Sequence, residues 1–424
     1  MLIEFSVKNF LSFRDKVIFS MERGNGNENY GNIFNINDVE LLKSCSIYGA
    51  NASGKSNLLK AFTCAIMMVR QSNIIPVGGK WINLKQFLFS DLSVKEPSEF
   101  EFLILVNGTK YKYNFAATKD KIVNESLEAF YSQKSTLIFS RTNTKEYKFH
   151  LPDEAKLKSI VGKNTDNKLF LATASNWNYD KTRDVYLWFM NSIDTFETFD
   201  TINRDDLINL SKGEEKLKKF TLNLLKEADI FINDFNVDYE EKDMDSTMVE
   251  MYIPPAARSN GIPKISSIKI ETFHEIFDEK NNKSVYRLNM DDESSGTKIL
   301  FVLAPFLKRA FETTKVIVVD ELEKSLHPTL VEYLIKIFNN SKINKANSQL
   351  IFTTHAVSLL NLDLFRRDQI YFIEKNPKNG VSDLYSLDDF SVRKDENIQK
   401  GYINGRYGAI PFINDIKLWD DNIE

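Results

Sequence analysis

The segment CSIYGANASGKSNLLKAF, residues 45–62, constrains the fold more than any other part of the sequence. An apolar run, a loop with the spacing Gly-x-x-x-x-Gly-Lys-Ser and a helical pattern follow one another, which is the arrangement of a phosphate-binding loop. Backbone N–H groups of such a loop surround phosphate oxygens, Lys55 reaches the β- and γ-phosphates, and the Ser56 hydroxyl can ligate Mg²⁺. We therefore expect ATP and Mg²⁺ as ligands, with nucleotide contacts from Gly49, Ala50, Asn51, Ala52, Ser53, Gly54, Lys55, Ser56 and Asn57.

A second candidate site lies in KVIVVDELEKSLHP, residues 315–328. The apolar residues Val316–Val319 predict a buried parallel strand that ends at two acids. In P-loop enzymes an aspartate at such a strand end helps to hold Mg²⁺, so Asp320 is the second predicted metal residue. Glu321 is then placed to act as a general base on a water molecule. Because many strands end in Asp, the pattern indicates a metal and catalytic site only together with the P-loop upstream.

The segment SQLIFTTHAVSLL predicts another apolar strand, at Leu350–Phe352, followed by Thr353, Thr354 and His355. A lone histidine is usually a satisfied polar group without a catalytic role. His355 follows a strand that comes after the acidic strand, which is where a histidine that senses the γ-phosphate would lie. We expect Glu321 and His355 to be the catalytic pair.

Ser294, Ser295 and Gly296 stand just before a predicted helix at Ile299–Phe311. Small residues at a helix N-terminus expose N–H groups and hydroxyls that bind anions. A simple helix cap would explain them equally well in isolation. Because the chain already has one phosphate loop, we expect this second anion site to close over a nucleotide held by another copy of the chain.

The order of these motifs resembles the ABC-type ATPases of the SMC, RecF and OLD group. The resemblance implies that two heads enclose ATP, that Ser294 and Gly296 act on the nucleotide of the partner copy, and that residues 325–328 cross the dimer interface. VKNFLSF, residues 7–13, is similar to the N-terminal strand that runs near the nucleotide in RecF-like heads.

A narrower resemblance, to RloA-like AAA/ABC ATPases of bacterial phage-defence and restriction-associated loci, rests on these motifs and on the tail RKDENIQKGYINGRYGAIPF, residues 393–412. In that tail, Arg406 and Tyr407 could contact a partner or cap a sheet. The sequence departs from the wider pattern at Ala52, where many heads have Gly, and at Glu293, where an apolar residue is usual. The glutamine that couples the metal site to the helical lobe is not identified; Gln71, Gln86 and Gln133 are the candidates.

The predicted fold is α/β: an ABC-type (SMC/RecF-like) P-loop ATPase head with an antiparallel β-subdomain and an inserted helical lobe. A strand pair is expected within residues 2–21, and Asn107-Gly108 predicts a type I′ hairpin turn. Four ranges follow: residues 1–130 as ATPase lobe I, 131–265 as a mainly helical lobe, 266–375 as ATPase lobe II and 376–424 as the tail.

The composition of the chain limits the kinds of partner that we expect it to bind. The net charge of −4 and the pI of about 5.8 give no support for a dedicated nucleic-acid binder. The sequence shows neither an eighteen-residue apolar run nor a secretory signal, so no membrane association is expected. Cys45 and Cys64 lack metal-ligand spacing, and we expect reduced core thiols in a cytoplasmic protein.

The leading functional hypothesis is an ATP-hydrolysing homodimer, or a multiple of dimers, that senses infection or the state of DNA. It would control a separately encoded effector, a nuclease or a toxin, in bacterial anti-phage defence. Only 69 residues follow His355, which we expect to be too few for a further nuclease domain. The alternative is a DNA-repair or DNA-clamp ATPase of the RecF or SMC kind, with DNA as a possible partner. A free-standing metabolic NTPase is the third reading, and the trans-acting Ser294 argues against it.

Overall fold

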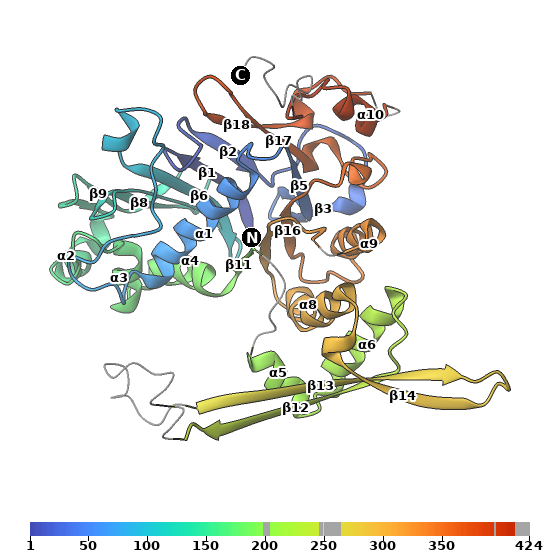
Figure 1. The fold of residues 1–424 in the computed structure, drawn as a ribbon. Helices are drawn as coiled ribbons and strands as arrows, with labels where there is room; N and C mark the ends of the chain where they lie inside the picture. The colour runs from blue at the N-terminus through green and yellow to red at the C-terminus, as the bar shows by residue number, and fades with distance from the viewer. Residues whose placement is uncertain (198–203, 246–248, 250–263, 325, 394–395, 412–424) are drawn as a thin grey trace, which may run out of the picture. The chain divides into compact units, whose positions relative to one another are not determined.

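The computed structural model describes residues 1–197, 204–245, 249, 264–324, 326–393 and 396–411 (Figure 1). The chain divides into two compact units. Unit 1 comprises residues 1–198, 313–324 and 334–424, and unit 2 comprises residues 199–312 and 325–333. Among the described residues, none of the helices combines the length and apolar character that a membrane span requires.

A six-stranded sheet forms the centre of unit 1 (Figure 1). Its order is β11 (Ile193–Phe196), β15 (Val316–Val319), β16 (Gln349–Thr353), β5 (Ser44–Tyr48), β17 (Ile370–Lys375) and β18 (Ser382–Ser386). The first five strands are parallel, and β18 pairs antiparallel with β17. Every residue of β5, β15 and β16 is buried, as expected for parallel strands covered on both faces. Because β16 lies between β5 and β15, the carboxyl ends of these three strands are neighbours.

An antiparallel sheet of seven strands forms the other layer of unit 1. Its hairpin between β6 and β7 turns at Asn107 (φ 49°) and Gly108 (φ 79°), which confirms the predicted type I′ turn. Helix α1 (Lys55–Gln71) packs on this sheet through Phe62, whose ring stacks on Phe5 with 3.8 Å between centroids. The strands run in the order β10 (Glu146–Phe149), β9 (Thr136–Thr142), β8 (Ile122–Phe130), β7 (Thr109–Ala117), β6 (Ser98–Val106), β1 (Leu2–Lys8) and β2 (Val17–Ser20).

The remaining elements of unit 1 are short. A two-stranded sheet joins β3 (Ile33–Ile36) to β4 (Val39–Leu42). The helices are α2 (Glu154–Val161), α3 (Phe170–Asn176), α4 (Asp180–Asn191) and, in the tail, α10 (Ile398–Ile403). Helix α9 (Pro328–Asn339) has residues in both units.

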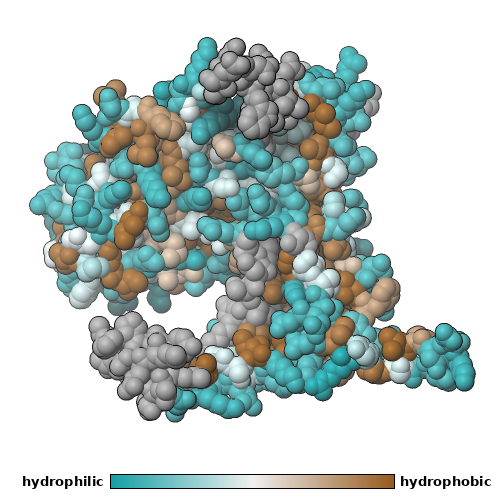
Figure 2. Space-filling view, viewed as in Figure 1, coloured by the Kyte–Doolittle hydropathy of each residue, from teal (hydrophilic) through white to brown (hydrophobic). Residues whose placement is uncertain are grey.

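Unit 2 contains helices and a three-stranded antiparallel sheet. The sheet order is β12 (Asp234–Asp243), β13 (Lys264–Phe277) and β14 (Lys283–Asn289). Figure 2 shows hydrophobic residues on the surface beside the hydrophilic tip of the β13–β14 hairpin, where Phe277 and Val285 are exposed. Helix α6 (Glu215–Glu227) packs on α8 (Ser295–Glu312), and α5 (Arg204–Ser211) is joined to α8 by the Arg309–Asp206 ion pair.

The α/β class with an antiparallel β-subdomain is confirmed, whereas the four predicted ranges differ from the two units. Within the range 131–265, β9 and β10 complete the antiparallel sheet and α2 to α4 belong to unit 1. The same range contributes β12, so the inserted unit is not only helical. Range 266–375 is divided between the two units, because α8 packs on α6 in unit 2 whereas β15, β16 and β17 belong to the six-stranded sheet of unit 1. The described tail belongs to unit 1.

The tail packs on strand β17 of the six-stranded sheet. Tyr407 is buried and its ring stacks on Phe372, with 5.9 Å between centroids. Tyr402 stacks on the same ring and also meets Tyr48, the residue just before the P-loop. Tyr407 therefore caps the sheet, whereas the guanidinium of Arg406 is half exposed and pairs with Glu396. Residues 394, 395 and 412 of the tail motif lie outside the described residues.

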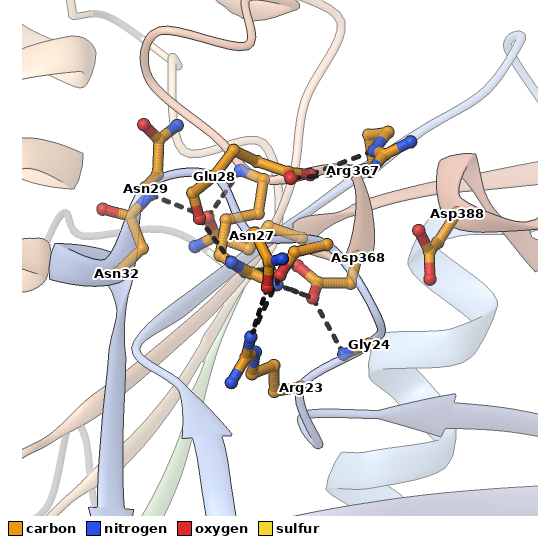
Figure 3. A network of polar contacts seen from close by, with 12 residues as sticks. Arg23, Gly24, Asn27, Glu28, Asn29, Asn32, Arg367, Asp368 and Asp388 are labelled. Atoms are coloured by element: carbon orange, nitrogen blue, oxygen red, sulfur yellow. Dashed lines mark hydrogen bonds and ion pairs between the residues drawn. The ribbon is translucent and has the colours of Figure 1, made fainter. Parts of the chain in front are cut away.

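A polar network fixes the amino-terminal end of β17 (Figure 3). Arg366 is fully buried, and its guanidinium donates to Asp368 at 2.9 and 2.6 Å and to the carbonyl oxygens of Gly26 and Glu28. Arg367 pairs with the Glu28 carboxylate at 3.0 Å. The network thus ties the loop around residues 24–32 to the start of β17.

Candidate functional site

The P-loop connects β5 to α1 through backbone conformations that suit very few residues. Gly54 has φ 122°, outside the range of residues with a side chain, and Ala52 has φ 61°. A Cβ atom at Gly49 would lie 2.5 Å from the carbonyl oxygen of Ile373, so no side chain fits there. Ala52 stands where many ATPase heads have Gly. Its left-handed backbone conformation costs free energy in a residue that has a side chain.

Lys55 opens helix α1 and folds back over the loop. Its ammonium donates hydrogen bonds to the carbonyl oxygens of Gly49, at 2.8 Å, and Ala50, at 3.1 Å. Burial lowers the pKa of Lys55, while the carboxylates of Asp320, Glu321 and Glu323 act in the opposite direction. The P-loop lysine therefore lies within electrostatic reach of the acids that follow β15.

Two serines that the sequence analysis did not identify support the loop. The Ser382 hydroxyl donates to the carbonyl oxygen of Ser53 at 2.5 Å, and Ser12 accepts a hydrogen bond from the Asn57 amide at 2.9 Å. Both hydroxyls would clash with a Cβ atom at Gly54, at 2.6 and 2.8 Å. Ser12 belongs to the VKNFLSF segment, so the predicted proximity of that segment to the P-loop is found here.

The acidic residues after β15 are held by the neighbouring strand. Thr353, the last residue of β16, donates its hydroxyl to the Asp320 carboxylate at 2.5 Å and accepts from the backbone N–H of Glu321 at 2.8 Å. Glu321 has φ 48°, an uncommon conformation for a residue with a side chain. Such outliers concentrate at functional sites, where surrounding contacts maintain them.

His355 lies beside the predicted general base. The distance between His355 Nε2 and a carboxylate oxygen of Glu321 is 3.6 Å, and both side chains are partly exposed. The backbone N–H of His355 donates to a carboxylate oxygen of Glu323 at 2.5 Å. The structure thus brings Glu321 and His355 together and adds Glu323, which sequence reasoning missed although it lies in the same acidic run.

The side chains present fit a magnesium ion held jointly with phosphates. Ser56 and Asp320 offer a hydroxyl and a carboxylate, the hard oxygen ligands that Mg²⁺ prefers. Among the described residues, no group of three or more His, Cys, Asp or Glu side chains is arranged as a metal site. One or two protein ligands, completed by substrate phosphates and water, are the usual arrangement for Mg²⁺.

Ser294, Ser295 and Gly296 belong to unit 2, at the start of α8, whereas the P-loop, Asp320, Glu321 and His355 belong to unit 1. The Ser294 hydroxyl caps the helix by accepting from the Thr297 N–H at 3.1 Å. Ser294 and Ser295 are exposed. Glu293 points back to β13, where its carboxylate contacts the Thr272 hydroxyl and, at 2.7 Å, His274.

Of the three candidate coupling glutamines, Gln86 lies next to the N-terminal segment that contains Ser12. The residues on either side are bonded to the turn that contains Ser12: Lys85 O accepts from Leu11 N at 2.9 Å, and Phe87 N donates to the Asn9 side chain at 3.1 Å. Gln71 ends α1, roughly 24 Å along the helix axis from Lys55. Gln133 lies between β8 and β9, two neighbouring strands of the antiparallel sheet.

The chain is similar to a known protein family and to solved structures. Residues 45–361 match the family model described as "AAA domain, putative AbiEii toxin, Type IV TA system". No curated protein matches the sequence. Among solved structures, a similar one is the crystal structure of an SMC head bound to the C-terminal winged-helix domain of ScpA, with 12% identity, a TM-score of 0.36 and coverage of 91% of this chain and 97% of that one.

The family match includes the P-loop, the start of α8, the acids after β15 and His355. It covers about three quarters of the sequence. The chain therefore belongs to this family of AAA domains, which are P-loop ATPases of the AAA/ABC type.

Proposed function

We propose that the protein is a cytoplasmic ATPase that hydrolyses ATP to ADP and phosphate and uses the cycle to control a separately encoded effector. The observation that carries hydrolysis is the distance of 3.6 Å between the side chains of Glu321 and His355, which follow the neighbouring strands β15 and β16. Strand β16 pairs directly with the P-loop strand β5. A carboxylate and an imidazole in this position can orient and deprotonate a water molecule.

Each residue has a distinct part in this proposal. The P-loop N–H groups and Lys55 bind the phosphates, and Ser56 with Asp320 holds Mg²⁺. The metal supplies charge neutralisation at the β- and γ-phosphates when it is bound. Glu321 accepts the proton of the attacking water, and His355 donates a hydrogen bond toward the γ-phosphate. Thr353 fixes Asp320 and the Glu321 backbone, which limits the reorganisation that the reaction requires.

We also propose that two copies join head to head around ATP. Ser294 and Ser295 support this step, because they are exposed at the N-terminus of an eighteen-residue helix whose positive end favours anions. Each copy would present Ser294 and Gly296 to the nucleotide of the other. ATP binding would favour the dimer and hydrolysis would release it, so the nucleotide changes which state is populated.

The effector assignment rests on the family. Its description names a putative toxin and a type IV toxin–antitoxin system, which is the support for a toxin as the effector. A nuclease as the alternative effector and a role in anti-phage defence are parts of the proposal that extend beyond this description. The tail packs next to Tyr48 and the P-loop, so a partner bound there would be close to the nucleotide.

We expect tagged Glu321→Gln protein, isolated from its native host with ATP and Mg²⁺, to retain one additional protein in fixed proportion. The variant should accumulate in the ATP-bound state that engages the effector, and mass spectrometry identifies what is retained. Lys55→Ala protein, which should not bind ATP, is the matched control. Recovery of DNA in a strongly salt-sensitive complex would instead favour the DNA-clamp alternative. Recovery of the chain alone would contradict the effector assignment.

A further inference from the structure

Glu323 connects the two loops that carry the catalytic pair. It follows Glu321 by two residues, and its carboxylate accepts a hydrogen bond from the backbone N–H of His355 at 2.5 Å. The loop after β15 and the loop after β16 are therefore joined directly at the residue that bears the imidazole. Hydrogen bonds to a charged acceptor are about twice as strong as neutral ones.

The second oxygen of this carboxylate faces the interior. Glu323 Oε2 is buried and has no hydrogen-bond partner among the described residues, and the same holds for the hydroxyl of Tyr48. The Glu323 charge contributes to raising the pKa of Tyr48, after burial, and opposes the lowering of the pKa of Lys55. One carboxylate thus lies near the last residue before the P-loop, the P-loop lysine and the histidine loop.

Leaving a carboxylate oxygen buried without a partner costs free energy. The contact of Glu323 with the His355 N–H fixes the position from which the imidazole of His355 reaches Glu321, at 3.6 Å. A displacement of about 1 Å at a catalytic group can cost about a hundredfold in rate.

We infer that Glu323 is a positioning residue. It keeps the imidazole of His355 beside the Glu321 carboxylate and thereby sets the rate of ATP hydrolysis. It acts through the His355 backbone. The inference rests on the proposed ATP hydrolysis, and it adds a residue to the site that neither the motif pattern nor the family description assigns.

The test is a double-variant cycle on the full chain, with steady-state ATP turnover and equilibrium binding of a fluorescent ATP analogue as readouts. Glu323→Ala is expected to lower kcat by about tenfold to a hundredfold and to leave the analogue's Kd within about twofold. Glu323→Gln retains an oxygen for the His355 N–H and should keep most of the kcat. Glu99→Ala, which removes an exposed partner of Lys8, is the matched control and should leave both values unchanged.

The decisive comparison is made in the His355→Ala background. If Glu323 acts through His355, Glu323→Ala lowers kcat no further there, because no imidazole remains to be positioned. A full additional loss in that background would overturn the inference, as would a Glu323→Gln variant as slow as Glu323→Ala. An inactive wild-type chain would instead refute the proposed hydrolysis, so the two failures are distinguishable.

Discussion

Glu321→Gln protein is expected to bind ATP and Mg²⁺ but to hydrolyse ATP about a hundredfold to ten-thousandfold more slowly than the wild type. The amide has nearly the shape of the carboxylate, so the backbone at φ 48° and the Thr353 contact can persist. It cannot accept a proton from water, and the loss of a general base accounts for this range of rates.

Phosphate release over time measures this effect, with analogue binding measured in parallel. Glu99→Gln, the same chemical change at an exposed ion pair on the antiparallel sheet, should match the wild type. Turnover of Glu321→Gln within a factor of two of the wild type would show that another residue activates the water.

The largest stability effect is expected for Arg366→Leu. Asp368 would keep a buried carboxylate, with 7% of its side chain exposed, without the guanidinium that pairs with it. The carbonyl oxygens of Gly26 and Glu28 would lose donors as well. Breaking a buried ion pair by removing one partner typically costs about 3–5 kcal/mol in the free energy of unfolding.

Urea unfolding followed by circular dichroism tests this loss in unit 1. Adding Asp368→Asn to Arg366→Leu should recover part of the stability, because it removes the unpaired charge. Arg14→Ala, which breaks an exposed pair with Asp15, should leave the unfolding midpoint unchanged. An Arg366→Leu midpoint equal to that of the wild type would contradict the assigned role of the network.

Local patterns predicted the parts of the site that follow directly from strands and helices. The apolar runs before Gly49 and Asp320 specify buried parallel strands, and Asn107-Gly108 specifies a hairpin, because each pattern acts over a few residues. The order of these strands in the sheet then brings their carboxyl ends together, as the structure shows.

Contacts between distant segments could not be predicted in the same way. Ser382 and Ser53 are bonded across 329 positions, and nothing near either serine indicates the other. The contact of Glu323 could not be predicted either, because an acid in such a run usually has a solvated side chain, and only the fold brings His355 beside it. The helical periods of α4 and α6 make the range 131–265 look mainly helical, whereas β12 alternates polar and apolar residues only over its first six positions and is polar after them.

The central claim is that each active site is built from residues of two copies of the chain. Mixing two inactive variants tests this claim most directly. Ser294→Arg and Lys55→Ala should each abolish turnover alone. In an equal mixture, half of the dimers are mixed and each has one intact site, so about a quarter of the wild-type turnover should return. Recovery near this level, dependent on protein concentration, is the predicted result. A mixture as inactive as its components, with dimers shown to form and exchange, would contradict the account.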